Sequence, residues 1–207
     1  ADRTAQAPNT VATRFGLASG TKTFTATLIL SLIGDRALSL KTPVRDILGA
    51  DLPLIAADVT VDHVLTHTSG IGYYLDEEID ALAPLPIPVQ DLDSTAAYLP
   101  LLDGHPAKFP AGERFSYCNS GYVVLAVIAE RVAGHAFADL VETRVFAAAG
   151  MSHSGFPRSD QLPAGTATGY RDDGRTNVFA LPVVGSGDGG AHSTEADLHA
   201  FWEALFE

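Results

Sequence analysis

The segment 122–132 constrains the fold most, because its side chains are apolar on almost every face of the helix that it would form. A surface helix carries an apolar stripe on one side only, so this segment predicts a helix surrounded by other elements. Gly134 stands where helices commonly end. Residues 23–33 have the same character and precede Gly34. Two such helices require a core that closes around both of them.

Two amphipathic patterns supply further elements for that core. A third helix is indicated by a stripe of apolar side chains: Phe137, Leu140, Val141 and Val145. A last helix is expected after Ser193 or Thr194 as its N-cap. Its apolar face would hold five large side chains: Leu198, Phe201, Trp202, Leu205 and Phe206. Burying each of them would contribute roughly 1.5–3 kcal/mol, so we expect something to cover this face.

Strands are scarce in this sequence, which predicts a mostly helical chain. Residues 166–171 and 177–183 flank Asp172-Asp173-Gly174 and are expected to form a short hairpin. Four glycines crowd the segment 185–190. Such a density indicates either a flexible loop or a backbone that approaches another part of the chain closely.

Composition excludes some classes of partner. The chain has 25 acidic and 13 basic side chains and a formal charge of −12, which would repel nucleic acid and anionic membrane surfaces. Its apolar runs are too short to span a bilayer. Cys118 is the single cysteine, so no internal disulfide can form and the redox compartment stays open. The length and the apolar content of 46% fit one globular domain.

Ser19 and Lys22 form a Ser-x-x-Lys sequence at the start of the first apolar helix. Residues three apart share one helical face, so hydroxyl and amine can meet. A lysine in a first helical turn is disfavoured by roughly 0.3–1 kcal/mol, yet one of only three lysines stands here. Burial and the helix dipole would favour the neutral amine, which can accept a proton from the serine. The alternative is a serine N-cap followed by a surface lysine.

Tyr117-Cys118-Asn119 is a second pattern that carries chemistry. In an extended segment, side chains two residues apart point the same way, so the phenol of Tyr117 and the amide of Asn119 could face one cleft. Chance occurrence of both patterns in this order is rare. Together they indicate an active site.

A phosphate-binding loop is the main rival from another class. Residues 16–23 miss the Gly-x-x-x-x-Gly-Lys-Thr pattern by one position, with Thr21 where glycine belongs. The Thr21 side chain would stand where the backbone must wrap the phosphate, and no apolar strand ending in a metal-binding aspartate follows. An α/β-hydrolase is disfavoured because no Gly-x-Ser-x-Gly sequence occurs.

Several segments resemble one family in the family's order. Residues 14–26 look like the nucleophile segment of class C β-lactamase-like hydrolases, and residues 64–71 are similar to the Leu-Leu-Thr-His-Thr-Ser-Gly-Leu signature of that group. Residues 110–122 resemble its Tyr-x-Asn segment, and residues 189–198 fit a later signature. The chain therefore resembles the penicillin-recognising serine hydrolases, which include class C β-lactamases, D-Ala-D-Ala carboxypeptidases and related esterases.

The resemblance implies an α+β, β-lactamase/transpeptidase-like fold and a covalent acyl-enzyme mechanism without a cofactor or metal. Ser19 would attack a carbonyl of a β-lactam, a D-Ala-D-Ala peptide or an ester. Lys22 and Tyr117 would handle the proton, while Asn119 would bind the substrate's amide or steady Lys22. The partner is then a small molecule or a peptide, and a periplasmic or secreted location fits the family.

The resemblance also predicts an incomplete sheet. Residues 1–207 would form a single domain that lacks the N-terminal and C-terminal sheet segments, together with the third motif, Lys-Thr-Gly or His-x-Gly. We therefore expect the last helix to expose an apolar face, which missing segments or self-association would cover. A non-catalytic binding or scaffold protein, or an inactive fragment that retains the fold, is the alternative function.

Other candidate residues have simpler interpretations. His63 and His67 could share a helix face as metal ligands, but no third ligand is evident, so a structural turn is preferred. His153-Ser154-Gly155 is the only His-x-Gly and is expected to be structural. Cys118 is expected to pack. A solvated acidic face is predicted from four carboxylates: Asp76, Glu77, Glu78 and Asp80.

Overall fold

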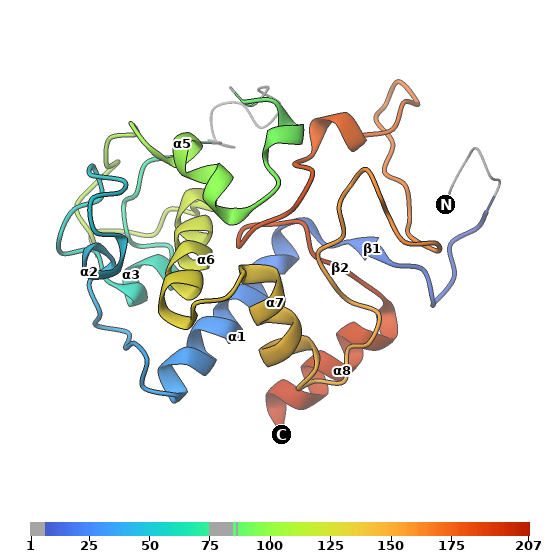
Figure 1. Cartoon of the computed structure of the whole chain (residues 1–207), viewed down its shortest axis with the longest axis horizontal. Helices are drawn as coiled ribbons and strands as arrows, with labels where there is room; N and C mark the ends of the chain where they lie inside the picture. Colours follow the sequence, from blue (N-terminus) through green and yellow to red (C-terminus); the bar gives the residue numbers. More distant parts are fainter. Residues whose placement is uncertain (1–6, 75–84, 86) are drawn as a thin grey trace.

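A computed structural model describes residues 7–74, 85 and 87–207 of the chain. The predicted acidic face at residues 76–80 lies outside these described residues. The longer helices are α1, α6 and α8, which span Thr21–Gly34, Asn119–Ala133 and Glu195–Phe206. The shorter α-helices are α2 (Val44–Leu48), α3 (Val61–Leu65), α5 (Leu99–Leu102) and α7 (Phe137–Val141). Figure 1 shows α1 and α6 in the centre, with the short helices around them.

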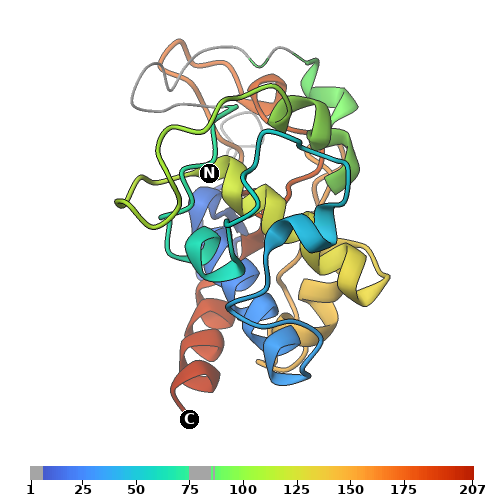
Figure 2. The ribbon, with the colours of Figure 1, turned by 90° about the vertical axis from the view of Figure 1, so that its left-hand side faces the viewer.

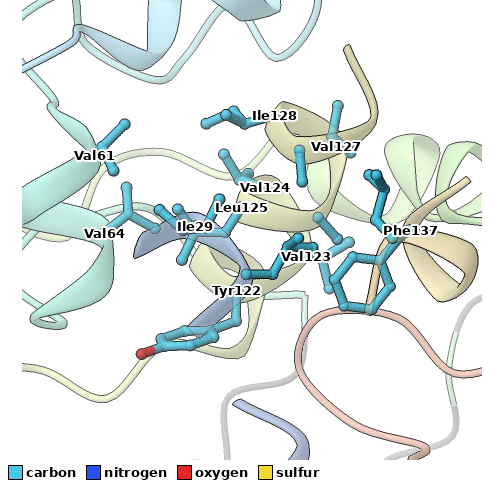
Figure 3. Close-up of a cluster of buried hydrophobic side chains, with 14 of the residues drawn as sticks. Ile29, Val61, Val64, Tyr122, Val123, Val124, Leu125, Val127, Ile128 and Phe137 are labelled. Carbon is cyan, nitrogen blue, oxygen red and sulfur yellow. The ribbon is translucent and has the colours of Figure 1, made fainter. Parts of the chain in front are cut away.

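The core forms around α6, as its all-round apolar pattern predicts. Every residue from Asn119 to Ala129 is buried. Figure 3 shows Val124 and Leu125 of α6 packed toward Ile29 of α1 and toward α3, with Phe137 of α7 near Val123. The helix ends as expected, because Gly134 adopts φ +72° and its N–H bonds the Glu130 carbonyl.

Two other predicted helices differ in detail from what the structure contains. α1 runs through Gly34 instead of ending before it, and Arg36 is the residue in the left-handed region, with φ +59°. The third helix begins as α7 and continues as a π-helical turn, η4, over Glu142–Phe146. Its predicted apolar stripe is buried at all four positions: Phe137, Leu140, Val141 and Val145.

The predicted hairpin over residues 166–183 is wrong. Only an isolated bridge joins Tyr170 to Thr176, and residues 178–180 form a single 3₁₀ turn, η5 (Val178–Ala180). The turn itself is present, because the Arg171 N–H bonds the Arg175 carbonyl at 2.8 Å. A two-stranded ribbon without a packing partner is marginal, and most of this segment is exposed.

The described residues contain one two-stranded sheet. β1 (Phe15–Gly16) pairs antiparallel with β2 (His192–Ser193), with Phe15 opposite Ser193. The pairing continues as the Leu17 N–H bonds the Ala191 carbonyl at 2.8 Å. This sheet joins the segment that leads into Ser19 to the segment that follows the glycine-rich loop, residues 185–190.

α8 begins as predicted, with the Thr194 hydroxyl accepting the Asp197 N–H at 3.3 Å. Phe201 is buried against Phe24 of α1, their ring centroids 4.9 Å apart. Trp202, Leu205 and Phe206 remain 45%, 43% and 81% exposed. Figure 2 shows α8 extending away from the other helices. The expected apolar exposure on this helix is therefore present.

No helix in the described part of the chain is long and apolar enough to cross a membrane.

Candidate active site

Ser19 and Lys22 meet where a 3₁₀ turn becomes α1. The turn, η1, spans Ala18–Gly20, and Lys22 is the second residue of α1. The Lys22 Nζ lies 3.1 Å from the Ser19 Oγ, as the spacing predicts. Lys22 is buried, with 6% of its surface exposed, whereas Ser19 is exposed. Ala18 has φ +45°, a strained conformation for a residue with a Cβ, and such strain is common at reactive positions.

The second partner of Lys22 comes from the glycine-rich loop. Its Nζ donates to the Asp188 carbonyl oxygen at 2.7 Å. Two threonines of α1 fix the loop beside the lysine. The Thr25 hydroxyl donates to the Gly187 carbonyl at 2.7 Å, and the Thr21 hydroxyl accepts the Ala191 N–H at 3.0 Å.

The glycines of this loop allow close backbone contact. Of the two alternatives for this segment, a flexible loop and a backbone that approaches another part of the chain, the structure shows the second. A Cβ on Gly187 would overlap the Tyr122 carbonyl oxygen, and a Cβ on Gly185 would lie 2.6 Å from the Gly190 Cα. Gly190 adopts φ +100°. The loop is therefore packed tightly between α1 and α6.

Two tyrosine hydroxyls hold this loop and the residue directly before it. Tyr74 donates to the Asp188 carboxylate, and burial raises the pKa of Tyr74 well above its usual range. Tyr98 donates to the Val184 carbonyl at 2.8 Å, and its pKa is also raised by burial. Both phenols therefore act as neutral donors. Neither tyrosine was singled out from the sequence, because their partners lie far along the chain.

Tyr117 lies beside Lys22, and Asn119 follows it at the start of α6. The Lys22 Nζ lies 4.9 Å from the centroid of the Tyr117 ring. Asn119 is the first residue of α6 and is buried. Cys118 is the N-cap, and its Sγ accepts the Gly121 N–H at 3.3 Å. Burial raises the pKa of the Cys118 thiol to about 11, so it is a neutral thiol that caps and packs.

His67 is a close neighbour of this site that sequence analysis assigned to a structural turn. Its ring lies between those of Tyr117 and Tyr122, and its Nδ1 accepts the Cys118 N–H at 3.1 Å. Burial, and then the charge of Lys22, lower the pKa of His67 to about 4. His63, in contrast, faces back to Thr60 and completes the capping box of α3. No cluster of three potential metal ligands occurs among the described residues.

The His153-Ser154-Gly155 segment lies at α8. The His153 N–H and the Ser154 hydroxyl both donate to the Asp197 carboxylate at 2.7 Å, and Gly155 bridges to His192 of β2. These contacts anchor the start of α8, which agrees with the expected structural role.

Comparison with known proteins identifies the family. The Beta-lactamase family model matches residues 1–206. Penicillin-binding protein 4* of Bacillus subtilis is 31% identical over 223 residues, which cover 100% of this chain and 48% of that protein. Esterase EstB of Burkholderia gladioli is 33% identical over 181 residues, covering 83% of this chain and 45% of the esterase.

A solved structure agrees with the sequence comparison. The penicillin-binding protein from Bacillus halodurans superposes with a TM-score of 0.91 and 43% identity, covering 99% of this chain and 64% of that one. The chain thus spans about half the length of the curated relatives it matches. The fold is β-lactamase/transpeptidase-like, and the described residues are mostly helical with one small sheet. The match over residues 1–206 also excludes a phosphate-binding loop at residues 16–23, and the chain belongs to the β-lactamase family of hydrolases.

Proposed function

We propose that the protein is a serine hydrolase that works through a covalent acyl-enzyme, with Ser19 as the nucleophile. One observation carries the proposal: the buried Lys22 amine lies 3.1 Å from an exposed serine hydroxyl and 2.7 Å from a fixed carbonyl oxygen. A serine hydroxyl is a weak nucleophile unless a base beside it takes its proton. Lys22 is the group placed to act as that base.

The reaction proceeds in two stages. The Ser19 hydroxyl gives its proton to Lys22 while its Oγ bonds the substrate's carbonyl carbon, and the carbonyl oxygen becomes an oxyanion near the Ser19 N–H. The C–N or C–O bond then breaks, and the leaving group takes a proton from the Tyr117 hydroxyl, which Lys22 reprotonates. A water molecule then attacks the acyl-enzyme carbonyl and gives a proton to Lys22. The bond between the acyl carbon and the Ser19 Oγ breaks, Lys22 returns that proton to the Ser19 Oγ, and the acid product leaves. Asn119, at the start of α6, binds the substrate's amide or steadies Lys22.

The proposed substrates are β-lactams, D-Ala-D-Ala peptides and esters. All three present a carbonyl carbon that a serine hydroxyl can attack, and they differ in the leaving group that the reaction must protonate. The names of the relatives support this range, because one is a penicillin-binding protein and another an esterase.

Covalent labelling tests the proposal. We expect a fluorescent penicillin or a fluorophosphonate to add one acyl or phosphonyl group to the protein, and Ser19→Ala to abolish the addition. Lys22→Ala should slow it by about 10²–10⁴-fold, the range for loss of a general base. Lys41→Ala, which removes an exposed lysine outside the site, is the matched control.

Intact mass spectrometry and the rate of fluorescence incorporation give the result. Labelling that persists in Ser19→Ala, or that is equally fast in Lys22→Ala and the parent, would contradict the proposed roles. A folded parent protein that neither label modifies would favour a non-catalytic binding or scaffold protein.

A further inference from the structure

His67 occupies an unusual backbone conformation directly after α3. Its φ is +57°, in the left-handed region that residues with a Cβ adopt at a cost. Such strain persists only where surrounding contacts hold it, and it is often found at functional sites. The His67 N–H bonds the Val64 carbonyl of α3 at 3.2 Å, and its other contacts include the segment that carries Tyr117 and Tyr122 of α6.

Two hydrogen bonds from His67 bracket Tyr117. The His67 carbonyl accepts the Ser116 N–H at 2.8 Å, and its Nδ1 accepts the Cys118 N–H at 3.1 Å. One residue therefore fixes the backbone on both sides of Tyr117. Because a neutral imidazole has one donor and one acceptor nitrogen, an Nδ1 acceptor requires the hydrogen on Nε2.

Ring packing adds a third constraint. The His67 ring centroid lies 4.6 Å from that of Tyr117 at 33°, and 4.9 Å from that of Tyr122 at 30°. The Tyr122 hydroxyl donates to the Leu65 carbonyl at 3.0 Å, which ties this ring to the end of α3. The Lys22 Nζ lies 4.9 Å from the Tyr117 ring and 5.8 Å from the Tyr122 ring. The His67 ring therefore packs between the two tyrosine rings, both of which lie beside Lys22.

Burial, and then the charge of Lys22, lower the pKa of His67 and keep its ring neutral. The ionisable groups that face it are Lys22 from α1, Tyr117 and Cys118 from the preceding segment, and Tyr122 from α6. Burial raises the pKa of Cys118 and of Tyr122, so both are neutral near pH 7. A protonated His67 would lose its acceptor and lie beside the Lys22 amine.

We propose that His67 is a positioning residue for the proposed acylation: it holds the Tyr117 phenol at Lys22 by clamping the backbone on both sides of Tyr117 and packing against its ring. The inference depends on the proposed function. His67 contacts the ring of Tyr117 and the backbone beside it, so its effect reaches the chemistry through Tyr117.

Variants of His67 test the proposal in the acylation rate. His67→Leu removes both the acceptor and the ring. His67→Asn keeps a side-chain acceptor and suits the left-handed backbone. We expect His67→Leu to lower the limiting acylation rate by about 10–100-fold with little change in the half-saturating concentration of penicillin, because misplacing a catalytic group by about 1 Å has this effect. His67→Asn should recover part of the rate, and His63→Leu, in α3, should leave it unchanged.

Imidazole NMR provides a measurement that needs no activity. The ¹⁵N signals of the His67 ring are assigned as those that disappear in His67→Asn. At pH 5.5 they should show a neutral ring with its hydrogen on Nε2. A parent that shows no Ser19-dependent labelling would refute the proposed function, while the NMR result would still test the clamp. Unchanged rates in His67→Leu, or a His67 ring protonated at pH 5.5, would overturn the positioning role alone.

Discussion

Asp188 contributes to the site in two ways. Its carbonyl oxygen accepts a hydrogen bond from the Lys22 amine and so orients it, and its side chain fixes the position of that carbonyl. The Tyr74 hydroxyl donates to the Asp188 carboxylate, while the Tyr98 hydroxyl donates to the carbonyl of Val184, directly before the loop. Tyr74 therefore holds Asp188, the residue whose carbonyl contacts Lys22. Tyr98 holds Val184, four positions earlier in the chain.

We expect Tyr74→Phe to slow acylation several-fold, because the Asp188 carbonyl loses part of its support. Tyr98→Phe removes the hydrogen bond to a main-chain carbonyl and should lower the free energy of unfolding by about 1–3 kcal/mol with little effect on acylation. Labelling rates and denaturant titrations of both variants measure the difference. If the two variants lose acylation rate equally, the special link between Tyr74 and Lys22 is disproved.

The lowered pKa of His67 has a consequence for stability. Its folded value is about 4 against an ordinary 6.5, so the unfolded chain binds a proton that the folded chain does not. The contribution of neutral His67 to the free energy of unfolding is complete above about pH 6.5 and is lost as the pH falls toward 4. Denaturant titrations at pH 7 and pH 5 should therefore show a larger drop for the parent than for His67→Asn. Equal drops would contradict the pKa.

At the scale of elements, the apolar pattern was sufficient for helices but not for strands or contacts. α6 and its terminal Gly134 could be predicted, since an all-round apolar helix has one stable environment. The hairpin could not be judged, because strand formation depends on a packing partner that local sequence does not encode. Ser19 and Lys22 were found by their spacing within one helical turn. His67 and Asp188 were missed because their contacts join residues 51 and 166 positions apart.

The end of α1 gives an element-scale prediction. Gly34 is helical and has no atom within 4 Å of where a Cβ would stand. Gly34→Ala should therefore raise the free energy of unfolding by about 0.5–1 kcal/mol, because alanine loses less entropy in a helix. The contrasting variant is Gly187→Ala, whose Cβ would overlap the Tyr122 carbonyl and should destabilise the protein. Thermal melts of both would be compared. Destabilisation by Gly34→Ala would mean that the helix ends where the sequence suggested.

At the scale of the whole molecule, the apolar side chains of α8 divide between core and surface. Phe201 completes the packing on Phe24, whereas Trp202 and Phe206 stack on each other at the surface, 6.0 Å apart. Adjacent exposed aromatic rings form a patch of the kind that marks a contact surface. The charge of −12 opposes association between copies, and the patch favours it.

We expect the 207-residue chain to self-associate through this patch. Light scattering coupled to size exclusion should give a mass that rises with protein concentration. Replacing Trp202 and Phe206 by Gln should shift the chain toward the monomer. Leu30→Gln, at an exposed apolar position on α1, should not. A parent that is monomeric at all concentrations would refute this expectation.

The contact between Lys22 and Asp188 also has a consequence during synthesis. The ribosome makes Lys22 before Asp188, whose carbonyl orients the lysine and follows 166 residues later. At about 5–20 residues per second, this interval lasts roughly 8–33 s. Throughout that time the nascent chain carries the proposed catalytic pair without the loop that orients Lys22. For the proposed mechanism, the acylating site is therefore complete only after the glycine-rich loop has left the exit tunnel.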